Sequence, residues 1–570
     1  MKIVIIGGVA GGATAVARLR RLNEHAEIIM FERGDHISFA NCGLPYYIGG
    51  TITDREDLIL QTPQSFNRRF NVDVRVQSEV LSIDRALKTV SAKNLHTGEI
   101  YTENYDKLIL APGSVPIKPT VEGIDSNRVF TLRDVSHTDK IKAFINDYHP
   151  RKAVMAGGGF IGVEMADNLK EAGLDVSIVE LSDQLISPLD IDMVCDVHYY
   201  LRQKGVSLYL SNGLKKITDQ NGALTFELSN GTIKADMLIL AVGVKPESSL
   251  ARDAGLAVNA NGGIITDKNM RTSDPDIYAV GDASEVTDFV TGQPAMIPLA
   301  GPANKQARIA ADDICGIPCE YTGIQGSAVI KVFDMTAAST GINEKTAKRL
   351  NLNYDKVFLW LPGHAGYYPG AKPMSMKVVF EKENGKILGA QIVGFDGADK
   401  RCDVLAAAIR AGMTAHDLTD LELCYAPPYS SAKDPVNMAG YVIENVITGK
   451  VLNFHWHEVD DLPRDGSVTL LDVRMPQEVM RGKIDGFINI PLDSLREHID
   501  ELDKSKPVYV HCHSGMRSYI AARILSQNGF DVYNLSGGYR LYSSVSNERR
   551  LKSNGIVEHD KSSDFMPAAP

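Results

Sequence analysis

Two glycine-rich loops, each placed between a short apolar run and a helical pattern, constrain the fold of this chain most strongly. The first run, Lys2–Ile6, is followed by Gly7-Gly8-Val9-Ala10-Gly11-Gly12, and the second, Lys152–Ala156, by Gly157-Gly158-Gly159-Phe160-Ile161-Gly162. A buried parallel strand, a tight glycine turn and a helix that begins at the loop form a dinucleotide-binding βαβ unit. The sequence therefore predicts an α/β fold with two Rossmann-like domains.

Each loop is followed at the expected distance by an acidic residue. A second strand is predicted at 27–31, before Glu32, and another at 176–179, before Glu180. A carboxylate there binds the ribose hydroxyls of a dinucleotide, and at position 180 it favours NADH because it would repel the 2′-phosphate of NADPH. The first loop departs from the strict pattern, which has glycine where Val9 stands. A turn that serves packing alone is the alternative for either loop, but two copies with their acids favour nucleotide binding.

Three later segments predict strands that end in turns: residues 105–113, 235–243 and 272–283, the last closing on Gly281-Asp282. Together with the loops, these segments resemble the pyridine nucleotide–disulfide oxidoreductases, flavoproteins with two dinucleotide-binding domains. The resemblance covers about residues 1–450 and implies FAD and NADH as cofactors, with Asp282 at the ribityl chain of FAD. The cofactor-binding positions expected on this basis are Gly7, Gly8, Ala10, Gly12, Glu32, Arg33, Ala111, Gly113, Gly157, Gly159, Phe160, Ile161, Gly162, Glu180, Gly243, Asp282 and Ala300.

A single cysteine, Cys42, follows the first nucleotide unit, in the segment Ser-Phe-Ala-Asn-Cys-Gly-Leu-Pro-Tyr-Tyr at residues 38–47. The next cysteine along the chain is Cys195, so the thiol has no neighbour with which to form a local redox disulfide. The segment resembles the single-cysteine branch of the family, which contains CoA-disulfide reductases, NADH oxidases, NADH peroxidases and persulfide reductases, and within it the CoA-disulfide reductase pattern. The resemblance implies that the Cys42 thiolate attacks a sulfur of the substrate. An inert buried cysteine is the alternative.

Two further segments resemble the same branch: Gly-His-Ala-Gly-Tyr-Tyr-Pro-Gly at 363–370 and Tyr-Ala-Pro-Pro-Tyr-Ser-Ser-Ala-Lys-Asp at 425–434. The resemblance implies that Tyr367 and Tyr425 reach the active site from the partner subunit of a homodimer. There a phenol can donate a proton to a leaving thiolate. The alternative for each tyrosine is an anchor in a core or an interface.

Coenzyme A, the substrate that the branch implies, needs cations for its phosphates. The helix predicted at 13–22 offers Arg18, Arg20 and Arg21. The positions that match the CoA contacts of the branch are Thr14, Arg18, Arg21, Ser38 and Asn41. A solvated helix face is the alternative for the arginines.

The pattern changes after residue 450. A strand predicted at 468–474 ends in Asp-Val-Arg, and a strand at 507–511 leads into Cys512-His-Ser-Gly-Met-Arg517, before a helix at 519–527. With Gly537-Gly538-Tyr539, these residues resemble a rhodanese domain. Such a loop turns backbone N–H groups toward the sulfur at a positive helix end, which lowers a thiol pKa and stabilises a persulfide, with Arg517 complementing its charge. A cysteine phosphatase, which holds phosphate in a related cradle, is the alternative.

The domain order follows from these resemblances. A discontinuous FAD-binding domain is expected at 1–112 and 250–322, with an NADH-binding domain inserted at 113–249. An α+β dimerisation domain, including a helix at 403–411, is expected at 323–450, and the rhodanese α/β domain at 455–550. A flexible tail is expected at 551–570.

Composition narrows the functional classes. The net charge of −11 argues against a nucleic-acid partner and against anionic membranes. Seven scattered cysteines do not suit a secreted disulfide scaffold, and no second ligand pair follows Cys315 and Cys319, so no metal site is predicted. No apolar run approaches the length of a membrane helix, and a cytoplasmic location is predicted.

These observations predict an FAD-dependent, NADH-oxidising reductase of CoA disulfide, CoA persulfide or polysulfide. Cys42 would form a mixed disulfide or a persulfide that is then reduced, and Cys512 would accept sulfane sulfur and hand it on. Two alternatives are kept: an NADH oxidase or peroxidase in which Cys42 cycles through a sulfenic acid, and a sulfur-carrier or sensor protein. The sequence does not rank the three sulfur substrates.

Overall fold

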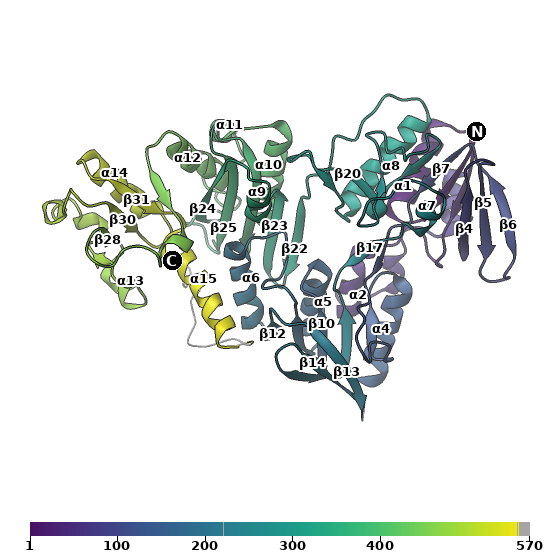
Figure 1. The fold of residues 1–570 in the computed structure, drawn as a ribbon, viewed down its shortest axis with the longest axis horizontal. Helices are drawn as coiled ribbons and strands as arrows, with labels where there is room; N and C mark the ends of the chain where they lie inside the picture. The colour runs from purple at the N-terminus through teal and green to yellow at the C-terminus, as the bar shows by residue number, and fades with distance from the viewer. Residues whose placement is uncertain (221, 556, 558–570) are drawn as a thin grey trace. The chain divides into compact units, whose positions relative to one another are not determined.

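The computed structural model describes residues 1–220, 222–555 and 557. The chain is an α/β protein that divides into two compact units (Figure 1). The first consists of Met1–Ser182 and Ser211–Ile324, and the second of Asp183–Leu210 and the chain from Gln325 onward. Both nucleotide loops lie in the first unit, and the rhodanese-like segment lies in the second.

The first nucleotide unit is built on a parallel five-stranded sheet. Its strands, in order, are β19 (Ile277–Ala279), β7 (Lys107–Leu110), β1 (Lys2–Ile6), β2 (Glu27–Phe31) and β3 (Asp73–Arg75). In β1, Ile3 and Ile5 pack with helices α1 (Ala10–Leu22) and α8 (Ala300–Ile314), whereas Val4 belongs to the core on the opposite face. Because both faces of the sheet are covered, the strand is apolar throughout.

A second parallel sheet carries the second loop. Its strands in the first unit are, in order, β11 (Asp175–Val179), β10 (Lys152–Ala156), β16 (Met237–Leu240) and β9 (Val129–Thr131). The chain crosses between the two nucleotide units twice, and the crossing strands β8 (Ser114–Pro116) and β17 (Val244–Pro246) pair with each other in antiparallel fashion. This double crossing is what the insertion of one nucleotide-binding domain into another requires.

The remaining elements of the first unit surround these sheets. They are η1 (Asn41–Gly43), α2 (Leu44–Gly49), η2 (Arg55–Leu58), α3 (Pro63–Phe70), β4 (Ser78–Asp84), β5 (Thr89–Asn94), β6 (Ile100–Asn104), α4 (Val135–Tyr148), α5 (Phe160–Glu171), β13 (Leu214–Gln220), β14 (Ala223–Leu228), β15 (Thr232–Ala235), α7 (Ser249–Asp253), β18 (Ile264–Ile265), η3 (Gly281–Ala283), β20 (Ser284–Thr287) and β21 (Pro294–Ala295).

The second unit contains two sheets of different kinds. The antiparallel sheet has the order β22 (Ala328–Val332), β23 (Met335–Gly341), β26 (Ile387–Gly394), β25 (Pro373–Glu381) and β24 (Tyr354–Pro362). The parallel sheet has the order β27 (Leu452–Phe454), β31 (Val532–Leu535), β30 (Val508–His511), β28 (Thr469–Asp472) and β29 (Ile488–Asn489). They correspond to the expected dimerisation and rhodanese folds.

Helices complete the second unit. They are α6 (Ile191–Gln203), α9 (Glu344–Arg349), α10 (Ala398–Ala411), α11 (Ala415–Asp420), α12 (Pro435–Ile447), η4 (Trp456–Glu458), α13 (Pro476–Met480), η5 (Leu492–Ser494), η6 (Ile499–Glu501), α14 (Met516–Gln527) and α15 (Gly538–Ser553), with the short strand β12 (Val206–Tyr209) after α6.

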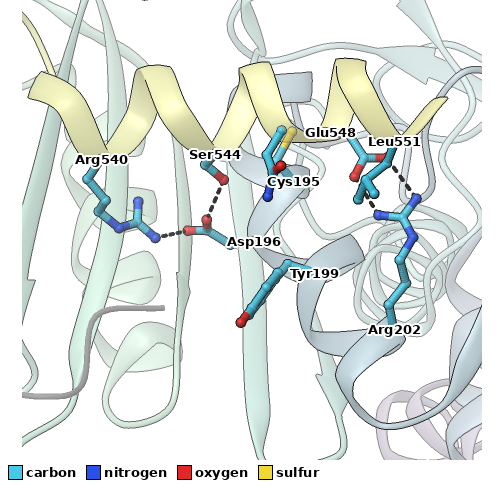
Figure 2. A pocket seen from close by; sticks show the side chains of 9 residues that line it. Cys195, Asp196, Tyr199, Arg202, Arg540, Ser544, Glu548 and Leu551 are labelled. Carbon is cyan, nitrogen blue, oxygen red and sulfur yellow. Dashed lines mark hydrogen bonds and ion pairs between the residues drawn. The ribbon is translucent and has the colours of Figure 1, made fainter. Parts of the chain in front are cut away.

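Helices α6 and α15 lie against each other through ionic contacts (Figure 2). Asp196 of α6 accepts hydrogen bonds from Arg540 at 2.5 Å and from Ser544 at 3.1 Å. One turn further along, Glu548 of α15 forms an ion pair with Arg202 at 2.5 Å. The last helix of the chain is thereby fixed to a helix that precedes it by more than three hundred residues.

Several helix boundaries differ from the predictions for one physical reason. The helix predicted at 13–22 begins at Ala10, inside the glycine loop, and the helix predicted at 403–411 begins at 398, directly after Gly397 with φ +68°. Glycine and alanine near a helix start carry little pattern, so a prediction from apolar spacing begins one turn late.

The predicted tail at 551–570 is wrong at its start. Helix α15 continues to Ser553, and Leu551 is buried, because its apolar side chain packs inside the second unit. The tail prediction for 556 and 558–570 lies outside the described residues.

Candidate active sites

The two glycine loops have nearly the same geometry. Gly7 has a φ of +102° and Gly157 a φ of +105°, a region that glycine enters without strain. A Cβ at Gly12 would lie 1.8 Å from the carbonyl oxygen of Gly7, and a Cβ at Gly162 would lie 2.0 Å from that of Gly157. Glycine is therefore required both at the turn and in the first helical turn of each loop.

The two acids that follow the loops also occupy equivalent places. Glu32 accepts the backbone N–H of Gly8 at 2.8 Å, and Glu180 accepts that of Gly158 at 2.6 Å. Each carboxylate accepts a second backbone N–H, from the residue two positions further on, at 2.7 Å. Both carboxylates are thus held at the mouth of their loop, where the ribose of a dinucleotide would lie.

The loops fit the pyrophosphate of a dinucleotide. A Cβ at Gly159 would meet no atom within 4 Å, so this glycine leaves space for a close approach to the backbone. Among the described residues no side chain caps α1 or α5, and their first-turn N–H groups remain available at the positive helix end. Ala10 begins α1, and Phe160 and Ile161 begin α5.

The other predicted cofactor positions gather around Asp282 of η3. Its carboxylate accepts the hydroxyl of Ser114 at 2.9 Å and faces Arg133 at 3.4 Å. Gly113 precedes that serine, and its carbonyl accepts the N–H of Glu247 beyond the second crossing strand. Ala111 directly follows β7, and Gly243 directly precedes β17.

Two more predicted cofactor positions of the first unit are Ala300 and Arg33. Ala300 begins α8, and Gln306 of that helix accepts the N–H of Gly281 at 2.7 Å, next to Asp282. Arg33 is exposed and lies 3.6 Å from Glu79. The structure gives Arg33 no contact with the glycine loops.

Cys42 lies in the short η1 helix, exposed at the surface of the first unit. The protein around the sulfur nevertheless withdraws water from it, and this desolvation, helped by the carboxylates of Glu164 and Asp282, raises the pKa of Cys42. Asp282 therefore faces both the predicted cofactor position and the predicted nucleophile. The thiolate needs further stabilisation that these neighbours do not provide.

The sequence analysis missed two ionisable groups beside Cys42. Glu164, on the second turn of α5, accepts the hydroxyl of Tyr46 at 3.4 Å. Burial is the main cause that raises the pKa of Glu164 to about 7 and that of Tyr46 to about 12. A carboxyl group that holds a proton near neutral pH thus lies next to the thiol. Its position two residues after Gly162 was the only signal available.

The predicted CoA positions are partly engaged within the protein. Thr14, Arg18 and Arg21 share one face of α1 by their spacing. The hydroxyl of Thr14 donates to Asn304 at 2.9 Å, and Arg18 forms an ion pair with Asp312 at 2.6 Å. Arg21 is exposed. These contacts leave Arg21 as the freest of the three side chains.

Two more CoA candidates come from the Cys42 segment. Ser38 has a φ of +46°, unusual for a residue with a side chain, and its N–H donates to the carbonyl of Gly8. Asn41 directly precedes Cys42 in η1. Arg20, by contrast, is buried and donates to the backbone carbonyls of Phe70 and Asn71, so its role is structural.

The structure brings Tyr367 and Tyr425 together in the second unit. Their hydroxyl oxygens lie 2.8 Å apart, and the hydrogen bond between them raises the pKa of Tyr367. The side chains are 76% and 49% exposed, so they present their phenols to the outside of the unit. Neither tyrosine is a core anchor in this chain.

A buried arginine holds the two tyrosine loops in place. Arg401 of α10 donates to the carbonyl of Gly363 at 2.9 Å, to Ser430 at 3.1 Å and to Asp434 at 3.0 Å. It therefore ties the segment before Tyr367 to the segment after Tyr425. The sequence offered no signal for this role, since Arg401 precedes the helix predicted at 403–411 and arginines are usually exposed.

The loop that follows β30 forms a cradle around Cys512. The sulfur accepts the N–H of Gly515 at 3.1 Å and the hydroxyl of Ser518 at 3.3 Å, and the side chain is 1% exposed. Gly515 has a φ of +108°, which turns its N–H toward the sulfur. Arg517 of the same loop forms a bidentate ion pair with Glu478 at 2.6 and 2.7 Å.

One wall of this cradle comes from the antiparallel sheet. The ring of His513 lies edge-on to Trp360 of β24, with 5.4 Å between the ring centroids. Arg540 of α15 donates its N–H to the carbonyl of His513 and lies over the same tryptophan at 5.7 Å. The sequence did not indicate Glu478 or Trp360, because neither belongs to the motif around Cys512.

Comparison with known proteins settles the family. The sequence model of the pyridine nucleotide-disulphide oxidoreductases matches residues 1–311, and that of their dimerisation domain matches residues 327–435. The chain belongs to the pyridine nucleotide-disulphide oxidoreductase family. A rhodanese-like domain is matched at residues 455–544. The family prediction is confirmed, and membership of this family implies FAD and NAD(H) as cofactors.

Individual relatives extend this likeness over the whole chain. The coenzyme A disulfide reductase of Staphylococcus epidermidis is 37% identical over 441 residues, which cover 77% of this chain and 99% of that protein. The crystal structure of reduced Bacillus anthracis CoADR-RHD is 52% identical with a TM-score of 0.94, covering 96% of this chain and 98% of its own. An NAD-dependent persulfide reductase from A. fulgidus is 38% identical with a TM-score of 0.88, covering 95% and 100%.

Two further observations concern membrane-spanning helices and metal sites. No helix in the described ranges has the length and apolar character needed to cross a membrane. Within the same ranges, no group of three or more His, Cys, Asp and Glu side chains is placed to hold a metal ion. Cys315 and Cys319 each have a pKa raised by burial, and Cys319 donates to the carbonyl of Ile309.

Proposed function

We propose that this oxidoreductase uses NADH and FAD to reduce S–S bonds in CoA disulfide, CoA persulfide or polysulfide. The observation that carries the proposal is Cys42, a lone exposed thiol on the unit that holds both nucleotide loops. The names of the similar proteins, a coenzyme A disulfide reductase and a persulfide reductase, point to the same chemistry. A flavoenzyme without a local second cysteine needs its partner sulfur from the substrate.

The nucleotide loops supply the reducing side of the reaction. The loop at 157–162 with Glu180 is proposed to bind NADH, and the loop at 7–12 with Glu32 and Asp282 to bind FAD. When bound, these cofactors bring two electrons to the sulfur of Cys42. Because Glu180 is held at the mouth of its loop, NADPH would place its 2′-phosphate against a carboxylate.

Cys42 is the proposed nucleophile. Its thiolate attacks one sulfur of a CoA disulfide, the bond from Sγ to that sulfur forms and the S–S bond breaks, which releases one CoA thiolate. With a persulfide or polysulfide, the same attack leaves Cys42 as a persulfide. The leaving thiolate needs a proton, and the protonated Glu164 and the phenols of Tyr367 and Tyr425 are candidate sources.

The tyrosine pair leads us to propose a homodimer. Both phenols are exposed on the second unit, and the matched dimerisation domain carries the loops that present them. In a dimer, the pair of one subunit would serve Cys42 of its partner. CoA would be held by Arg18, Arg21, Thr14, Ser38 and Asn41, with Arg18 shared between CoA and Asp312.

The C-terminal part is proposed to act in sulfur transfer. Cys512 would accept a sulfane sulfur, with Arg517 ordering the loop, and pass it on to a thiol or to the reductase. The expected domain boundaries, the FAD-binding part at 1–112 and 250–322, the NADH-binding part at 113–249 and the dimerisation part at 323–450, belong to this proposal. The rhodanese domain is proposed to extend from 455 to 553, and the protein to work in the cytoplasm.

The test is NADH oxidation by the purified protein with five acceptors: CoA disulfide, CoA persulfide, polysulfide, hydrogen peroxide and oxygen. We expect one of the sulfur compounds to give the highest kcat/KM, and the mass of the isolated oxidised enzyme to include a CoA adduct or an added sulfur at Cys42. Oxygen or peroxide as the best acceptor would replace the proposal by an NADH oxidase or peroxidase. No NADH turnover with any acceptor would favour a sulfur carrier or sensor.

A further inference from the structure

Three arginines surround the Cys512 cradle, and each already has a carboxylate partner. Arg517, in the loop itself, forms its bidentate ion pair with Glu478. Arg540, whose backbone binds the carbonyl of His513, donates to Asp196 at 2.5 Å. The third, Arg474, is paired with Asp472 of β28.

Arg474 donates to Asp472 at 2.7 Å, and both side chains are fully buried. Its guanidinium lies 4.0 Å from the centroid of Tyr539, whose N–H donates to the carbonyl of Cys512 at 2.8 Å. Within the part of the chain that the structure describes, each of the three arginines therefore has its positive charge compensated by a carboxylate. A buried pair of this kind is an electrically neutral unit for a ligand that approaches from outside.

The two histidines of the segment do not add charge. Burial lowers the pKa of His513 to about 4 and that of His511 to about 4. The charges that act on His513 are those of Glu478, Arg540, Arg474 and Arg517. Both imidazoles are neutral near pH 7, so these histidines and paired arginines add no net charge, and the cradle offers sulfur its hydrogen-bond donors and the N-terminus of α14.

Of the three pairs, the one between Arg517 and Glu478 stands at the entrance. Their side chains are 33% and 31% exposed, whereas Asp472 and Arg474 are buried behind the loop. Glu478 also accepts the N–H of Met475 at 3.0 Å, which fixes its carboxylate at the start of α13. The contact with Arg517 lowers the pKa of Glu478 to about 2, so it stays ionised at any pH at which the enzyme works.

We infer that Glu478 determines which sulfur donors reach Cys512. By neutralising Arg517 at the entrance, it makes the cradle favour sulfane sulfur carried on a thiol, as a hydropersulfide whose reacting S–SH group has at most one negative charge, over the dianion thiosulfate. The inference rests on the proposed role of Cys512 in sulfur transfer and adds the class of donor. Specificity arises because the described arginines of the cradle are all paired, so a dianion finds no free guanidinium among them to offset the loss of its hydration.

The step itself conserves atoms and electrons. The Cys512 thiolate attacks the terminal sulfur of a hydropersulfide R–S–SH, the Sγ–S bond forms, and the bond between the two donor sulfurs breaks. The products are the Cys512 persulfide and the thiol R–SH, with the donor proton retained between them. With thiosulfate, the same attack would release sulfite, and no external oxidant or reductant enters either transfer.

The test compares two donors, sodium thiosulfate and cysteine hydropersulfide, with cyanide as the acceptor of sulfur and without NADH. Glu478→Gln keeps the side-chain length and an acceptor for the N–H of Met475 but removes the charge. We expect the ratio of kcat/KM for thiosulfate to that for hydropersulfide to rise about tenfold or more, mainly through KM. The gain should shrink as ionic strength increases, which a purely structural defect would not produce.

Two matched variants complete the experiment. Glu497→Gln removes one negative charge from an exposed residue of the same domain and should leave the donor ratio unchanged. Glu478→Asp keeps the charge and should stay closer to the original ratio than Glu478→Gln. If Glu478→Gln does not fold, a donor ratio in Glu478→Asp that has shifted toward thiosulfate by partial loss of the ion pair still supports the inference.

The inference is overturned if the unmodified protein uses thiosulfate as well as hydropersulfide, or if Glu478→Gln leaves the ratio within about twofold of it. These outcomes are separate from those of the NADH assay. A protein that prefers hydropersulfide at Cys512 but does not oxidise NADH with any sulfur acceptor would contradict the proposed function alone. The reverse pattern would contradict only the role of Glu478.

Discussion

Cys42 and Cys512 are two sulfur sites in one chain, and their surroundings differ in kind. Cys512 is buried, and its sulfur accepts two hydrogen bonds from its own loop. Cys42 is exposed, and the described residues donate no hydrogen bond to its sulfur, while desolvation and, to a lesser degree, two carboxylates raise its pKa. The hydrogen bonds to Cys512 thus come from its own unit. For Cys42 we propose instead that bound cofactor and substrate, together with the tyrosine pair of another subunit, complete the site.

The ionisable neighbours sharpen this contrast. Burial raises the pKa of the carboxyl group of Glu164 to about 7 near Cys42, and it lowers the pKa of the imidazole of His513 to about 4 near Cys512. The first group can hold and release a proton in the range where the enzyme works. The imidazole of His513 stays neutral in that range. The charge of this neighbour of Cys512 therefore does not change with pH near neutrality, whereas the charge of Glu164 near Cys42 does.

The strongest test of the comparison removes each sulfur in turn. Cys42→Ser should lower NADH-dependent turnover of CoA disulfide by at least about a thousandfold, since the nucleophile is lost. Cys512→Ser should abolish sulfur transfer from hydropersulfide to cyanide. Cys315→Ser, a partly exposed cysteine of the same unit as Cys42, is the matched control and should retain turnover. Equal loss of CoA disulfide turnover in Cys512→Ser and Cys42→Ser would contradict separate roles for the two cysteines.

The pH dependence of stability tests the cradle. The pKa of His511 is lowered from its ordinary 6.5 to about 4 in the folded protein, so its contribution to stability is complete above about pH 6.5. It is lost as the pH falls toward 4, because the unfolded chain then binds the proton first, and the loss amounts to roughly 3 kcal/mol. Thermal unfolding from pH 7 to 4.5 measures it, and His511→Asn should flatten the curve. The same slope in both proteins would contradict this assignment.

Substitution of Tyr367 tests whether the chemistry at Cys42 depends on the tyrosine pair. Tyr367→Phe should lower kcat for CoA disulfide about a hundredfold with little change in thermal stability, because only an exposed hydroxyl is removed. Tyr429→Phe alters an exposed tyrosine of the neighbouring loop and serves as the control. Mixed dimers of Tyr367→Phe and Cys42→Ser subunits should retain one intact site. Wild-type kcat in Tyr367→Phe would exclude the proton-donor role.

Glu164 gives the smallest expected effect. If its proton is used at Cys42, kcat/KM for CoA disulfide should show an inflection near pH 7, with lower activity above it as the carboxyl group ionises. Glu164→Gln should remove this inflection and lower kcat/KM about tenfold. A pH profile that is unchanged in the variant would assign the inflection to another group.

The parts of the site that could be predicted from sequence are those fixed by local geometry. Gly7, Gly12 and Glu32 follow from the steric needs of one turn and one strand end, and the second loop repeats them. The same holds for the Cys512 loop, where a glycine at +108° and a following helix are encoded within a few residues. The roles of Cys42 and the two tyrosines follow from the family resemblance alone, and they stay a prediction.

The residues that could not be predicted act through packing between distant segments. Arg401 holds two loops, Trp360 closes a cradle that belongs to another sheet, and Glu478 pairs with an arginine 39 positions away. Their side-chain types are common on surfaces, so no local pattern distinguishes them. Arg20 shows the opposite error. Its place on the helix predicts a cation for the CoA phosphates, but its guanidinium donates to backbone carbonyls.

The contact between α6 and α15 has a consequence for the order in which the protein can be made. Asp196 and Arg540 are 344 positions apart, and Arg202 and Glu548 are 346 positions apart. At about 5–20 residues per second, a ribosome needs roughly 20–70 s to reach the second helix after completing the first. During that interval Arg202 lacks its carboxylate partner, and Asp196 has Ser375 but not yet Arg540. The fold is therefore completed only when the last helix emerges, and a chain shortened before α15 would keep that unfinished surface permanently.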